Sequence, residues 1–133
     1  MDAPAGFSEA PDQGPFLENA GPLLMRGEGS DLVLGLRAEK RHLNRGGAVM
    51  GGMLATFADY ALGRAIEADA DDDHQRATVS LTVDFIAAVK AGDWIESRTS
   101  VDRVGGSLAF ADCSLTVDGD EVVRARAVFS RVG

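Results

Sequence analysis

Hydrophobic residues recur at two different spacings along this chain, and the change of spacing separates strands from one long helix. Two short alternating segments, at residues 23–28 and 32–38, flank a Gly-Ser-Asp turn, and this arrangement predicts a β-hairpin. A single helical turn is expected before them, at residues 16–20. From residue 51 to about residue 68 the apolar positions follow the helical period instead, so they share one broad face. The pattern therefore predicts a hairpin followed by an amphipathic helix.

The second half of the chain alternates between apolar and polar residues in four stretches. These stretches are residues 78–87, 94–104, 108–117 and 122–132. In the first of them, Val79, Leu81, Val83 and Phe85 are expected on one face. Gly-rich and Asp-Gly-Asp turn sequences join the later stretches into hairpins. Strands that follow one another in this way predict an α+β fold with an antiparallel sheet and one helix on it. Because such a sheet leaves an edge or a face uncovered, we expect an oligomer.

Length and composition point to one globular domain. The chain has 133 residues, 45% of them hydrophobic, which suits a single domain with its own core. Residues 1–14 are rich in Pro, Gly, Ala and acids and are expected to form a flexible tail, so the domain would span residues 15–133. The N-terminus resembles no signal peptide and no segment is apolar enough to span a bilayer, so no membrane partner is expected.

Charge and cysteine content exclude several classes of function. The formal net charge of −8 repels phosphates and anionic membranes, so nucleic acid is not an expected partner. The single cysteine, Cys113, lies in an alternating segment and is expected in the core, which together with the absence of a disulfide framework suits the cytoplasm. No Cys/His ligand spacing is present, and the acidic run at residues 69–73 lacks the spacing of a calcium loop. We therefore expect no metal site.

An acid in the middle of the predicted helix is the strongest chemical signal. Asp59 borders the apolar face and has Gly52 and Gly63 among its helical neighbours. Glycines let a ligand or another backbone approach closely, and a half-buried carboxylate is costly unless something uses it. Two interpretations of Asp59 remain open at this point: a carboxylate that faces a ligand, or an exposed aspartate at the border of the apolar helix face.

The loop before the helix adds donors for a carbonyl oxygen. Its glycines are Gly46, Gly47, Gly51 and Gly52. If the helix begins near Gly51, its first N–H groups are unpaired and can stabilise an oxyanion. Asn44 either adds a side-chain amide or only forms a turn, and His42 either contacts a ligand or only supports the loop. Loop and helix together indicate a site that binds or hydrolyses a carbonyl compound.

These residues resemble the PaaI-type hotdog-fold thioesterases. The matching positions are His42-x-Asn44-x-x-Gly47-x-x-Met50-Gly51-Gly52, then Ala58-Asp59, where the family pattern is H-x-N-x-x-G-x-x-H-G-G followed by a helical Asp. The likeness extends over about residues 14 to 132, with Thr78-Val79-x-Leu81, Phe85 and Gly92-Asp93 downstream. It implies a hotdog fold, in which an antiparallel sheet wraps around one long central helix.

The resemblance also implies a function and a set of roles. The expected activity is hydrolysis of an acyl-CoA to a carboxylic acid and coenzyme A, with no metal or organic cofactor. Asp59 would act as general base or nucleophile, and the N–H of Gly51 would polarise the thioester carbonyl. Asn44 would hold the substrate or the water, and Thr78 would position the water. The expected substrate-binding residues are Met50, Gly52, His42 and Phe85. The site would form between two subunits of a homodimer or a dimer of dimers.

One position departs from the family pattern. Met50 stands where the family has His, and its thioether neither donates to an oxygen nor carries a proton. This departure leaves open a non-catalytic acyl-CoA-binding protein on the same fold. A hotdog hydratase acting on enoyl thioesters is a second alternative, but it would need a catalytic His paired with an acid. His42 and His74 are poorly placed for that pairing.

Overall fold

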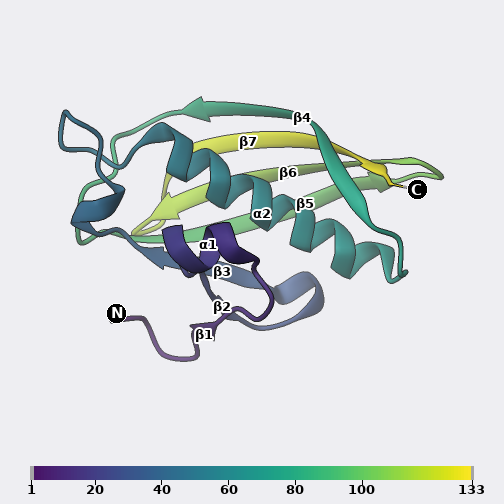
Figure 1. Ribbon diagram of the computed structural model, residues 1–133, viewed down its shortest axis with the longest axis horizontal. Coiled ribbons are helices and arrows are strands. Elements are labelled where there is room, and N and C mark those ends of the chain that lie inside the picture. The colour runs from purple at the N-terminus through teal and green to yellow at the C-terminus, as the bar shows by residue number, and fades with distance from the viewer. Residues whose placement is uncertain (1, 133) are drawn as a thin grey trace.

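The computed structural model describes residues 2–132, and its main feature is a long helix lying across a seven-stranded sheet (Figure 1). In chain order the elements are β1 (Ser8–Glu9), α1 (Pro15–Ala20), β2 (Leu24–Arg26), η1 (Gly29–Asp31), β3 (Val33–Arg37), η2 (Lys40–His42), α2 (Gly51–Ala70), β4 (Arg76–Phe85), β5 (Trp94–Val104), β6 (Leu108–Val117) and β7 (Asp120–Arg131). The strands follow the order β1-β2-β3-β5-β6-β7-β4, and every neighbouring pair is antiparallel. The predicted α+β class with an antiparallel sheet is therefore confirmed.

Helix α2 forms because its apolar residues recur at the helical period and meet the sheet on one side. Its buried residues are Leu54, Phe57, Ala58, Ala61, Leu62 and Ile66. The helix begins at Gly51, as predicted, and ends at Ala70, two residues beyond the predicted end. Asp71 caps it in the left-handed conformation, with φ of 49°, a common way for a helix to end. The core therefore lies between this helix and the sheet.

Strand β4 lies at one edge of the sheet. It pairs with β7 on one side only, although it directly follows α2 in the chain. Two of its apolar side chains are largely exposed, Val79 at 59% and Phe85 at 55%. A long edge strand with exposed apolar residues is a surface on which another chain can pair. This edge therefore agrees with the expectation of an oligomer without testing it.

Residues 2–14, part of the segment expected to form a flexible tail, make specific contacts with the rest of the chain. Phe7 packs edge-on against Trp94, with ring centroids 5.0 Å apart. Gln13 is buried and its amide bonds to the Ala10 carbonyl at 2.8 Å, the Leu23 carbonyl at 3.0 Å and the Leu23 N–H at 2.8 Å. The amide thus takes the place of a strand partner. Such pairing depends on distant residues, so local composition does not reveal it.

Three further findings concern membrane crossing, metal binding and the cysteine. Across residues 2–132, no helix has both the length and the apolar character that a membrane crossing requires. Within the same residues, no three side chains of the metal-binding types gather to hold an ion. Cys113 is buried, as predicted, and desolvation raises the pKa of its thiol to about 12. A thiol with that pKa stays protonated and is a poor nucleophile.

Candidate active site

The N-terminus of α2 offers free backbone donors. Met50 occupies the N-cap position and makes no side-chain cap. Its carbonyl accepts the N–H groups of Met53 at 3.0 Å and Leu54 at 3.2 Å. The N–H groups of Gly51 and Gly52 have no acceptor among residues 2–132. These two donors lie at the positive end of the helix dipole, where they suit a carbonyl oxygen that gains negative charge.

Asn44, one of the predicted site residues, holds the loop before the helix together. The Asn44 Oδ1 atom accepts the N–H groups of Gly46 at 2.9 Å and Ala48 at 3.2 Å, which is an Asx turn. Asn44 therefore shapes the loop with its oxygen, and its side-chain NH₂ group remains without an acceptor among the described residues. The turn interpretation and a ligand contact through that NH₂ group are compatible.

His42 lies behind the loop and is 5% exposed. Its Nδ1 atom accepts the Glu39 N–H at 3.0 Å, so the ring proton resides on Nε2, which lies 2.7 Å from the Ala20 carbonyl and donates to it. Both ring nitrogens are therefore occupied within the chain. This geometry favours the loop-supporting interpretation of His42 over direct substrate contact.

Asp59 and Thr78 meet on the helix-facing side of strand β4. The Thr78 hydroxyl donates to Oδ1 of Asp59 at 2.7 Å. Asp59 is half-buried, and its Oδ2 atom has no hydrogen-bond partner among residues 2–132. One oxygen of the carboxylate is thus anchored while the other is free to accept a proton or attack a carbon.

A β-bulge makes this contact possible. Thr78 pairs with Phe129 and Ser80 pairs with Val128, so Val79 is an extra residue in the strand. In a regular strand Thr78 and Leu81, three residues apart, would point to opposite faces, because side chains alternate along a strand. The bulge removes this difference, so both side chains lie on one face. The predicted single face of Val79 with the later apolar residues is corrected accordingly: Val79 occupies the bulge and is exposed. No local sequence signal marks this bulge.

Phe85, Gly51 and Asn44 come together in a second group, around an open pocket of about 300 Å³. Its remaining lining residues are Val49, Leu54, Ile86, Ala87, Ala88 and Val89. Phe85 lies over the helix start, since a Cβ atom at Gly51 would be 3.2 Å from its ring. Met50 and Gly52 flank the lining residue Gly51 in the chain. Met50 is 55% exposed, and Gly52 is exposed as well. The alternation of apolar and polar residues along the chain does not indicate the contribution of residues 86–89.

Within one chain these two groups stay apart. Gly51 and Asp59 are separated by eight residues of one helix, which is about 12 Å along its axis. Reacting groups must approach to roughly 3–3.5 Å. A single chain therefore does not bring the Asp59 carboxylate and the Gly51 amide to the same carbonyl.

Comparisons with known proteins identify the family and the fold. The sequence model of the Thioesterase superfamily matches residues 46–124. A Pseudomonas aeruginosa protein named "Putative esterase PA0474" is 36% identical over 97% of this chain and 97% of its own length. The Escherichia coli PaaI protein from the phenylacetic acid degradation operon is similar in structure, with a TM-score of 0.80, 20% identity, and coverage of 91% of this chain and 87% of its own.

A further structural neighbour is smu.793 from Streptococcus mutans, described as bound to acetyl CoA. Its TM-score is 0.81 at 17% identity, over 95% of this chain and 98% of its own. At such identities the structural likeness concerns the fold. Together with the family match it confirms the predicted hotdog architecture, an antiparallel sheet around one long helix.

Proposed function

Because this chain belongs to the Thioesterase superfamily, we propose that it hydrolyses an acyl-CoA thioester to a carboxylic acid and free coenzyme A. The observation that carries the proposal is the anchored carboxylate of Asp59, whose second oxygen is free beside Thr78. The resemblance to PaaI-type proteins predicted from residues 42–59 is confirmed by the same comparisons. The acyl group itself is not specified by this observation.

The proposed chemistry uses the free oxygen of Asp59 in one of two ways. As a general base it takes a proton from water, whose oxygen then adds to the thioester carbon. As a nucleophile it adds to that carbon itself, and water later hydrolyses the resulting anhydride. In both routes the C–S bond breaks and the sulfur leaves with the bonding electron pair, to be protonated as coenzyme A. Thr78 holds the carboxylate through its hydroxyl.

The Gly51 amide of the partner subunit would bind the carbonyl oxygen as negative charge develops on it. The distance of about 12 Å between Gly51 and Asp59 within one helix supports a site shared between two chains. The exposed edge of β4, beside Thr78, supports a homodimer that forms at this flank. Asn44 of the partner subunit would then contribute its free NH₂ group to the substrate. A dimer of two such dimers is equally compatible with these contacts.

The chemistry needs only a carboxylate, backbone amides and water. We therefore propose no metal ion or organic cofactor, with coenzyme A entering as part of the substrate. The neighbour described as bound to acetyl CoA supports this substrate class at the level of the fold. A cytoplasmic location is proposed as well, supported by the single buried cysteine.

A non-catalytic acyl-CoA-binding protein is the second candidate, favoured by Met50. The test measures free thiol released from a panel of acyl-CoAs and, beside it, binding of the same compounds by calorimetry. Thiol release that Asp59→Asn abolishes supports the thioesterase. Tight binding without thiol release supports the binding protein and contradicts our proposal.

Met50→His sharpens this choice. If Met50 only weakens a working site, restoring a donor should raise an existing rate by about ten-fold or more. Met50→Leu, which keeps the size but not the sulfur, should leave the rate close to that of the natural chain. Activity that appears only with His at this position would identify the natural chain as the binding protein.

A further inference from the structure

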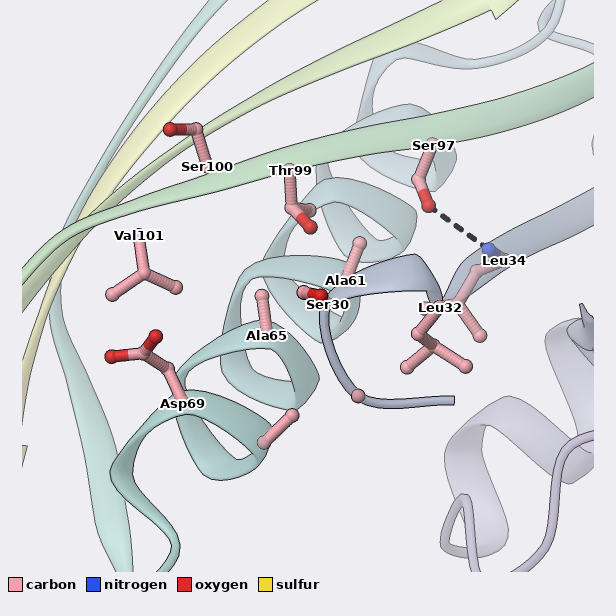
Figure 2. Close-up of a pocket in the computed structure, with 12 residues that line it drawn as sticks. Ser30, Leu32, Leu34, Ala61, Ala65, Asp69, Ser97, Thr99, Ser100 and Val101 are labelled. Carbon is pink, nitrogen blue, oxygen red and sulfur yellow. Dashed lines mark hydrogen bonds between the residues drawn. The ribbon is translucent and has the colours of Figure 1, made fainter. Parts of the chain in front are cut away.

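A second cavity lies on the opposite flank of helix α2. It has a volume of about 350 Å³ and is lined by the C-terminal half of α2, the η1 turn and strand β5 (Figure 2). Its apolar walls are Leu32, Leu34, Ala61, Ala65, Ala68 and Val101. The volume lies within the range of small-molecule sites in proteins. Small side chains on α2 leave this space open, and the pocket is large enough for a ligand of about ten non-hydrogen atoms.

This cavity is separate from the candidate active site. Ala61 and Ala65 follow Asp59 by two and six residues, which places them about 200° and 240° around the helix from it. None of the residues that line the pocket beside Gly51 lines this cavity. A ligand held here therefore does not contact Asp59 or Thr78.

The charge of the cavity differs from that of a coenzyme A site. Its lining contains no Lys, Arg or His, and its one charged residue is Asp69. The Asp69 carboxylate makes no ion pair or hydrogen bond with any described residue between 2 and 132. It lies in the last turn of α2, where free carbonyls add negative potential. These groups repel phosphates and carboxylates and attract a cation.

Ser97 supplies the second polar group. It is 2% exposed, and its Oγ atom accepts the N–H of Leu34 at 3.0 Å. Its own hydroxyl hydrogen has no acceptor among the described residues. A buried donor without an acceptor is costly, so an oxygen from a ligand would be stabilising there. Figure 2 shows Ser97 and Asp69 toward opposite ends of the cavity.

We propose that this cavity binds a small organic cation that also carries a polar oxygen. The ammonium group lies toward Asp69, the oxygen accepts the Ser97 hydroxyl, and a hydrocarbon body fills the space between Ala65 and Val101. The inference concerns binding alone and is independent of the proposed thioesterase activity.

The test uses the full chain and four related probes, with binding followed by amide chemical shifts in heteronuclear NMR. Tyramine carries both polar groups, para-ethylphenol lacks the ammonium, phenethylamine lacks the oxygen, and para-hydroxyphenylpropionate replaces the ammonium with a carboxylate. Tyramine should bind with shifts centred on Ala61, Ala65, Thr99 and Val101. Loss of the ammonium should weaken binding about three- to five-fold, since Asp69 is exposed. Loss of the oxygen should weaken it by up to about ten-fold, and the carboxylate should bind more weakly than para-ethylphenol, because Asp69 repels it.

Two pairs of variants assign the binding to this cavity. Asp69→Asn should reduce the affinity for tyramine to that for para-ethylphenol. Asp73→Asn makes the same change of charge outside the lining and should leave the affinity for tyramine unchanged. Ala65→Leu should fill the space and abolish binding, whereas Ala70→Leu on the same helix should not. If Ala65→Leu fails to fold, the Asp69 pair and the probe series decide. Absence of shifts at the cavity, equal binding of the carboxylate, or shifts centred on Asp59 would each overturn the proposal.

Discussion

The two flanks of helix α2 differ in how much of each a single chain completes. The flank toward β3 and β5 carries a cavity lined by residues of this chain. The flank toward β4 carries Asp59 and Thr78 beside a strand that has a free edge. Because the Gly51 amide lies two helical turns away, the second flank needs another chain to complete its proposed chemistry. The proposed chemistry on the β4 flank thus depends on assembly, whereas the proposed ligand contacts on the other flank use residues of one chain.

Replacing the carboxylate should produce the largest effect. Asp59→Asn keeps the size of the side chain but removes the group that would take a proton or attack the thioester. We expect acyl-CoA hydrolysis to fall by about 10³-fold, measured as thiol release, with an unchanged melting temperature. Asp73→Asn serves as the matched control, since it changes the charge equally in the exposed loop after α2. Near-normal turnover of Asp59→Asn would contradict the assignment of the β4 flank.

Removing a single backbone donor should give the next largest effect. Gly51→Pro deletes one N–H at the first position of α2, where proline is tolerated, and Met50 already has a compatible backbone with ψ of 133°. Gly51→Ala is the matched control, because its Cβ meets the same Phe85 ring at 3.2 Å but the N–H remains. We expect the proline variant to be slower than the alanine variant by about 10²-fold or more. Equal rates would exclude this amide from the reaction.

Mixed oligomers test whether the two groups act across subunits. Asp59→Asn and Gly51→Pro are each expected to be nearly inactive alone. In a mixed dimer, one of the two sites combines an intact Asp59 with an intact Gly51, so random mixing should restore about a quarter of the natural activity. No recovery in verified mixed dimers would indicate a site within one chain.

The hydroxyl that anchors Asp59 should matter less than the carboxylate itself. Thr78→Val keeps the shape of the side chain and removes the donor to Oδ1, whose distance is 2.7 Å. Because a hydrogen bond to a charged group is worth roughly 1.5–3 kcal/mol, we expect kcat to fall by about ten-fold or more. Thr78→Ser retains the donor and should stay close to the natural rate. Equal kcat values for the two variants would show that the anchoring bond is not used.

The smallest effect concerns the connection from α2 to β4. Arg76 donates two hydrogen bonds to Asp72, at 3.1 and 2.9 Å, and this bonding lowers the pKa of Asp72 from 3.8 to about 2. A carboxyl whose folded pKa is depressed stabilises the fold above its unfolded pKa and loses that contribution as the pH falls through its folded pKa. Asp72→Asn should therefore lower the melting temperature slightly at neutral pH and by less near pH 2. If Asp72→Asn lowered the melting temperature equally at neutral pH and near pH 2, the stabilising role of the ionised Asp72 carboxylate would be contradicted.

Much of the fold could be predicted because it follows from local patterns. The helical period located α2, including its start at Gly51, and the turn sequences located the hairpins of β5, β6 and β7. The N-terminal segment could not be predicted in this way, since Gln13 bonds to Leu23 across α1. Its content of Pro, Gly, Ala and acids predicts a tail, whereas in the structure its strand β1 pairs with β2.

The sequence by itself determined the helix that carries Asp59, the donors at its start and the spacing that keeps them apart in one chain. These properties follow from the order of residues along one element, so neighbouring residues are enough to specify them. Only the tertiary structure decided that Thr78 reaches Asp59, because the bulge at Val79 arises from pairing with β7. It also decided that β4 lies at the sheet edge and that a cavity opens on the other flank. Both depend on contacts between residues far apart in the chain, which no local pattern records.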